Sequence, residues 1–132
     1  MKTDSQIVED QERFAKALIE FTDKIENLEK FDKIGPVWDD QPQDYYFGLV
    51  TRANVTAILV RFLKGELTSK DVYHWAEAID CRETINGEPE YRELINGILS
   101  AITIDYDAGS LITKETAYEF IKSLESAKPE HV

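Results

Sequence analysis

The fold is decided by the stretch LVRFLKGELTSKDVYHWAEAID, residues 59–80. An apolar run ends at Gly65, the residue type that most easily adopts the left-handed conformation closing a helix. A new helix should begin after Thr68, whose hydroxyl can cap free backbone N–H groups, and Asp71 adds a carboxylate at the positive end of the helix dipole. The stretch therefore predicts a helix, a break and a second helix.

The second of these helices carries one apolar stripe. Val72, Trp75, Ala76 and Ile79 recur at the helical period, and Leu67 stands before the cap at the spacing of a hydrophobic staple with Val72. The stripe is expected to be buried. The remaining positions, expected on or near the side facing water, are Lys70, Asp71, Glu77 and Asp80.

Length and composition indicate one globular domain. The chain has 132 residues, of which 42% are hydrophobic and 31% charged, and this is enough to bury a core without help. One cysteine, Cys81, excludes an intramolecular disulfide, and the N-terminus shows no signal-peptide hydrophobic core. The longest apolar run is too short to span a bilayer. The cytoplasm is the expected compartment, with no membrane contact.

Net charge is the most informative global property. The sequence holds 15 Lys and Arg against 26 Asp and Glu, a formal charge of -11. Because nucleic-acid binding needs a basic surface, direct binding to nucleic acid is not expected. Residues 65–108 alone carry -7. This acidity either aids solubility or steers a basic partner toward the protein.

The other segments complete an all-α, single-domain bundle of about five helices. Residues 5–31 predict one long helix with a narrow apolar seam, either packed in the core or forming a homodimeric coiled coil. Residues 44–64 predict a second helix, although the β-branched side chains in 46–60 would also suit a strand. Its expected apolar face is Tyr46, Leu49, Val50, Ala53, Ala57, Val60 and Leu63 or Lys64.

Later signals place the last two helices. Asn86–Gly87 indicates a turn, Pro89 suits the first position of the fourth helix, and Thr113 suits the cap of the last. Residues 127–132 are expected to form a frayed tail.

Residues 34–46 form the main interruption, because two prolines forbid a continuous helix there. This irregular loop mixes aromatic and acidic side chains and contains no basic residue from Gly35 to Tyr46. Aromatic groups supply contact area and carboxylates supply orientation against a cation, so the loop suits recognition; alternatively Trp38 fills the core. The residues concerned are Trp38, Asp39, Asp40, Asp44, Tyr45 and Tyr46.

No catalytic, cofactor or metal signature is found in the sequence. His74 and Cys81 would lie about 10 Å apart along one helix, too far for a thiolate–imidazolium pair. One cysteine and two histidines cannot form an ordinary zinc site. Residues 105–116 fail the calcium-loop pattern at three ligand or glycine positions. We therefore expect a protein that is not an enzyme and holds no cofactor.

Residues 62–68, FLKGELT, together with Trp75-Ala76 and the small helices that follow as far as Leu124, resemble the small acidic helical immunity proteins of bacteria. These are the cognate inhibitors of colicin-like and contact-dependent growth-inhibition toxins. The resemblance covers about half of the chain and carries over no individual functional residue. It implies a cytoplasmic protein that binds one toxin domain, often a basic nuclease, and occludes its active site with acidic and aromatic groups.

Two functions follow as expectations. The first is immunity to a toxin, with a basic protein as partner and a monomer or weak homodimer as the state of the free chain. The second is a regulatory or adaptor helical protein, homodimeric through its first helix and without a toxin partner. For the first, the expected partner-binding residues are those of the loop named above together with Glu88, Glu90, Tyr91 and Glu93.

Overall fold

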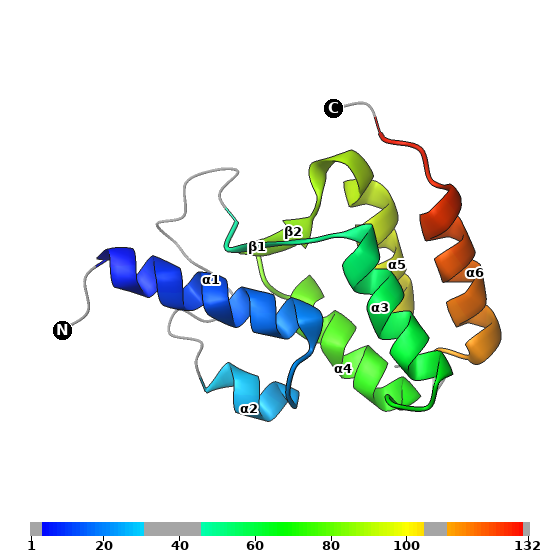
Figure 1. Cartoon of the computed structure of the whole chain (residues 1–132), viewed down its shortest axis with the longest axis horizontal. Coiled ribbons are helices and arrows are strands. Elements are labelled where there is room, and N and C mark those ends of the chain that lie inside the picture. Colours follow the sequence, from blue (N-terminus) through cyan, green and yellow to red (C-terminus); the bar gives the residue numbers. More distant parts are fainter. Residues whose placement is uncertain (1–3, 31–45, 105–110, 131–132) are drawn as a thin grey trace.

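The computed structural model describes residues 4–30, 46–104 and 111–130. The described helices are α1 (Asp4–Glu20), α2 (Ile25–Glu29), α3 (Arg52–Leu63), α4 (Ser69–Asp80), α5 (Arg92–Ile104) and α6 (Lys114–Ser126). A 3-10 turn, η1 (Pro89–Tyr91), precedes α5, and two short strands, β1 (Gly48–Val50) and β2 (Ile85–Gly87), pair in parallel. The prediction of an all-α fold is confirmed, apart from this two-stranded sheet (Figure 1).

The turn between α3 and α4 forms as predicted. Gly65 has a φ of 82°, and the N–H groups of Gly65 and Glu66 donate to the carbonyls of Phe62 and Arg61, which satisfies the end of α3. Thr68 and Asp71 form a reciprocal capping box at the start of α4. The stripe of Val72, Trp75, Ala76 and Ile79 is fully buried.

Trp75 lies at the centre of the core. Its side chain is completely buried, and its indole Nε1–H donates to the carbonyl of Ile19 at 3.1 Å. This hydrogen bond joins α4 to the last turn of α1, and α5 packs along another side of α4. One residue of the predicted stripe thus ties the N-terminal helix to the central pair.

The prediction of one helix over residues 5–31 is wrong. Helix α1 ends at Glu20, where Phe21 adopts a φ of 52° and the N–H groups of Phe21 and Thr22 donate to Leu18 and Ala17. This is the same closure that Gly65 makes after α3. Because glycine usually marks it and phenylalanine does not, the sequence pattern carried no warning. Burial of the Phe21 ring offsets the strain of its backbone.

The prediction of a helix over residues 44–64 is partly wrong, because a strand and a helix share the segment. β1 occupies Gly48–Val50, and α3 begins only at Arg52, where Thr51 and Asn54 form a capping box. The later start changes the buried face. In place of the predicted set, the buried side chains of α3 are Val55, Ile58, Leu59 and Phe62.

Asn86–Gly87 is not a turn but the end of β2, paired with Leu49 and Val50 of β1. Parallel strands need a crossover, and α3 with α4 supplies it. A two-stranded parallel pair is not recognisable from three-residue segments, since alternation needs a longer run to show.

The chain after α6 differs from the predicted frayed tail as far as Glu130. Thr113 caps α6 as predicted. Beyond the helix, the Glu130 N–H donates to the Glu90 carbonyl at 2.7 Å, and its carboxylate accepts from the N–H groups of Glu93 and Leu94 at 3.1 and 3.2 Å. Glu130 therefore caps α5 from a distant part of the chain.

Trp75→Phe is expected to lower the free energy of unfolding by about 2–3 kcal/mol, because it leaves a cavity and an unsatisfied Ile19 carbonyl. Urea denaturation measures the change. Tyr118→Phe, at a side chain that is 63% exposed, is the control and should change the free energy by less than about 0.5 kcal/mol. Equal effects of the two substitutions would contradict the central role of Trp75.

Candidate functional site

Most of the predicted recognition loop, including Trp38, Asp39, Asp40, Asp44 and Tyr45, lies outside the described residues. Tyr46 is described, and it is partly buried immediately before β1.

The contact of Tyr46 is with a cation of its own chain. The Arg92 guanidinium lies 5.2 Å from the Tyr46 ring centroid and donates to the Gly87 carbonyl at 2.9 Å. Tyr46 is therefore held against the start of α5 and the end of β2.

Two of the predicted partner-binding residues are engaged inside the protein. The Glu88 carboxylate accepts from the backbone N–H of Arg52 at 2.9 Å and so caps α3 from outside that helix. The Tyr91 ring is buried, and the Arg52 guanidinium lies 3.8 Å from its centroid. Glu90 and Glu93 remain exposed, beside Glu130 at the start of α5. Of these predicted partner-binding residues, Glu88 and Tyr91 therefore have structural roles, whereas Glu90 and Glu93 lie at the surface.

Arg61 shows a mode of contact that recurs in this protein. Its guanidinium donates to the carbonyls of Glu20 and Phe21 at 3.3 and 3.2 Å, and it lies 5.8 Å from the Phe21 ring centroid. Helix α1 has no basic residue in its own last turn. Arg61 of α3 thus supplies the positive charge that stabilises the negative end of the α1 dipole.

Arg52 does the same for α6. It donates to the carbonyl of Leu124 at 3.0 Å while it lies over the Tyr91 ring. Helix α6 also has no basic residue in its last turn. A single side chain at the start of α3 therefore connects the last helix with η1.

Arg82 and Arg92 complete a set of four inward arginines. Arg82 is buried; it donates to the Ala78 carbonyl in the last turn of α4 at 2.7 Å and lies 5.2 Å from the Phe14 ring centroid. Arg92 makes the carbonyl and ring contacts described above. Guanidinium groups suit this role because they present several donors in one plane and stack on rings.

Exposed carboxylates outnumber exposed cations on the described part of the protein. Arg13 is the remaining arginine; it is exposed and pairs with Asp10 at 2.6 Å. Every described lysine is exposed. The guanidinium groups keep their positive charge in these contacts, and the acidic field of the surface follows from the net charge of -11.

A polar pocket opens where α4 ends beside β2 and α5. Its volume is about 370 Å³, and its buried lining residues are Ile79, Ile85, Leu99 and Arg82. The more accessible lining carries the functional groups. These residues are Tyr46, Asp80, Glu83, Asn86 and Asn96.

Asp80 is a charged group of this pocket whose position is unfavourable for the ionised form. It is the last residue of α4, where a carboxylate opposes the helix dipole. No hydrogen bond or ion pair reaches its carboxylate from the described part of the chain, and desolvation raises its pKa above the usual 3.8. Sequence reasoning placed Asp80 only on the solvent side; the signal it missed was an acid ending a helix with no basic residue in the last turn.

The two carboxamides in the pocket, those of Asn86 and Asn96, are hydrogen-bonded to one another. The Asn86 Oδ1 accepts from the Gly87 N–H at 2.8 Å and from the Asn96 Nδ2 at 2.9 Å. The Asn96 oxygen is left as an acceptor on the same wall. The pocket thus combines a carboxylate, a fixed amide acceptor and an apolar floor.

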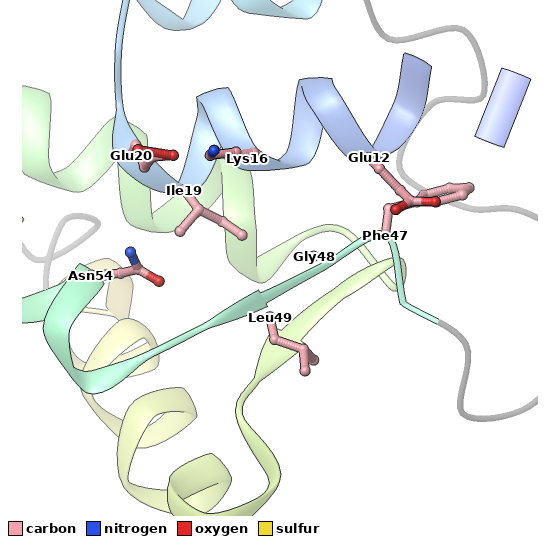
Figure 2. A pocket seen from close by; sticks show the side chains of 8 residues that line it. All are labelled: Glu12, Lys16, Ile19, Glu20, Phe47, Gly48, Leu49 and Asn54. Carbon is pink, nitrogen blue, oxygen red and sulfur yellow. The ribbon is translucent and has the colours of Figure 1, made fainter. Parts of the chain in front are cut away.

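A second hollow lies between α1 and β1 (Figure 2). Gly48 allows this approach, since a Cβ there would lie 2.9 Å from the Ile19 Cδ1. Glu12, Lys16 and Glu20 line the helix side of the groove. Because their charges alternate in sign, the groove favours neither cations nor anions, and it is the weaker candidate.

The residues considered for catalysis are not brought together. His74 lines a different hollow, between α2 and α4. The Cys81 thiol is exposed, and its pKa is raised by desolvation and by the nearby Glu77 and Glu29 carboxylates, against the opposing effect of Arg82. A raised pKa leaves little thiolate at neutral pH. Within the described ranges, no three His, Cys, Asp or Glu side chains gather closely enough to hold a metal ion.

The chain matches no protein-family model, and neither curated proteins nor solved structures show significant similarity to it. Among the described helices, none is both long and apolar enough to cross a membrane.

Arg61→Met is expected to lower the free energy of unfolding by about 1–3 kcal/mol, because it removes the cation that closes α1. Arg13→Met is the matched control, and its exposed pair with Asp10 should contribute less than about 1 kcal/mol. Chemical denaturation of both variants measures the difference. A larger loss for Arg13→Met would contradict the structural role of the inward arginines.

Asp80→Asn is expected to raise the melting temperature slightly at pH 7. The folded-state pKa lies above the unfolded value near 3.8, so the native state binds more protons between the two values and stability falls as pH rises through that window. The penalty persists at neutral pH, and the amide removes it. Thermal unfolding between pH 3 and pH 7 should show the gain disappearing below the unfolded pKa; a lower melting temperature at pH 7 would contradict this assignment.

Proposed function

We propose that this protein is an inhibitor of the immunity type, which binds a basic toxin domain in the cytoplasm and blocks its active site. The observation that supports the proposal most strongly is the orientation of the arginines. Four of them, one buried and three partly buried, contact carbonyls and rings of their own chain, and among the described residues exposed carboxylates outnumber exposed cations. Such a surface attracts a basic partner over a distance and orients it before contact.

Other features fit the same proposal. The rigid helices support exposed carboxylates near Asp80 and Glu83 and near Glu90 and Glu93. The sequence resemblance to immunity proteins points to the same class of partner. Inhibition by occlusion requires a stable scaffold and a complementary surface, without catalytic groups of its own.

Dimerisation through the first helix, the form in which the alternative adaptor function was tied to the structure, is not favoured by the burial of that helix. It rested on an exposed apolar seam in the first helix. Phe14, Leu18 and Leu28 of that seam are buried within the protein's own core. A polar substitution at Leu18 would therefore unfold the chain and could not report on a dimer interface.

Growth protection tests the proposed function. The protein encoded beside this gene is examined for a C-terminal basic domain, and that domain is expressed alone and together with the present chain. Co-expression should restore growth that the domain alone arrests. In vitro, the association rate constant should fall by about tenfold or more between low and high salt, because charge steering is screened.

A charge-matched control separates specific inhibition from general acidity. An unrelated acidic protein of similar net charge should give no protection. Protection by that control, absence of any growth-arresting basic neighbour, or an association rate that does not change with salt would each contradict the proposal.

A further inference from the structure

The pocket beside the end of α4 contains a charged group, the Asp80 carboxylate, whose position lowers the stability of the fold. The Asp80 carboxylate sits at the negative end of a helix, is partly desolvated, and receives no hydrogen bond or ion pair from the described residues. Each circumstance disfavours the ionised form. A group that breaks local rules without a compensating contact in its own chain is typical of a binding site.

The residues around Asp80 indicate what kind of ligand the pocket would bind. Asn96 offers a carboxamide oxygen, since its Nδ2 is already donating to Asn86. Arg82 also belongs to the lining, where its buried guanidinium donates to the Ala78 carbonyl and lies against the Phe14 ring. It is the one cation among the described residues that line the pocket, and it forms no ion pair with Asp80.

The floor of the pocket specifies the rest of the ligand. Ile79, Ile85 and Leu99 belong to its lining and are 2%, 6% and 1% exposed, so the apolar contact that they offer to a hydrocarbon chain is confined to their edges. Long basic side chains have this composition, with an apolar stem and a charged end. The volume of about 370 Å³ is sufficient for one such side chain and its hydration.

We propose that this pocket receives a lysine or arginine side chain of the partner protein, with Asp80 as its counter-charge and Asn96 as a hydrogen-bond acceptor. This inference rests on the proposed function, because it assigns the basic partner of that function to one place on the surface. It also explains why Asp80 is kept at a position that weakens the fold. On binding, the cation supplies an interaction that the described residues do not provide.

A titration with small probes tests the site without the partner. The full chain, labelled with nitrogen-15, is titrated with N-acetyl-arginine amide and, separately, with the uncharged analogue N-acetyl-citrulline amide. The arginine probe should shift the side-chain amide signals of Asn86 and Asn96 and the backbone signals of residues 80–87. The citrulline probe should leave these signals unchanged, since it has the shape without the charge.

Two charge-neutralising substitutions provide the matched comparison. Asp80→Asn should abolish the shifts caused by the arginine probe. Asp23→Asn removes the same charge from an exposed position before α2 and should preserve the shifts. Because Asp80→Asn is expected to be at least as stable as the parent, loss of binding cannot be ascribed to unfolding. Equal shifts with both probes, or unchanged shifts in Asp80→Asn, would overturn the pocket assignment.

With the basic domain from the growth assay, Asp80→Asn should weaken binding by about tenfold, and Asp23→Asn should change it by less than about twofold. Protection and tight binding that are insensitive to Asp80→Asn would overturn the pocket while leaving the proposed function intact. Shifts by the arginine probe without any growth-arresting partner would instead contradict the proposed function.

Discussion

The contact between an arginine and a backbone carbonyl, made against an aromatic ring, holds the elements of this protein together. Arg61 joins α3 to the end of α1, and Arg52 joins the start of α3 to the last turn of α6. Arg82 closes α4 against α1, and Arg92 joins α5 to β2 and to Tyr46. Because three of these contacts lie at helix C-termini without basic residues in the last turn, the guanidinium groups also stabilise the helix dipoles.

This use of arginine links the stability of the fold to the proposed function, the binding of a basic partner. A protein with 26 acidic and 15 basic side chains could place most of its cations in surface ion pairs. Here four guanidinium groups contact carbonyls and rings of their own chain, while most of the described carboxylates are exposed. The acidic field that would attract a basic partner follows from the net charge of -11 and from the exposure of these carboxylates. At Asp80, a single charge that is unfavourable to the fold is available for the proposed binding.

The sequence predicted the central helix pair well, because Gly65, Thr68 and Asp71 each signal a helix boundary through local chemistry. It failed where the decisive interaction was distant. Phe21 ends α1 although its type gives no such signal, and Glu130 caps α5 through residues far away in the sequence. The candidate site was missed for the same reason: Asp80, Asn86 and Asn96 come from α4, β2 and α5 and meet only in the folded chain.

The salt dependence of thermal stability tests most directly whether repulsion among the carboxylates outweighs their ion pairing within the fold. Surface ion pairs weaken as salt is added, whereas repulsion among unneutralised carboxylates is relieved. We expect the melting temperature of the free protein at pH 7 to rise between about 20 mM and about 500 mM sodium chloride. A melting temperature that falls over this range would contradict this expectation, because it would mean that ion pairs dominate the surface.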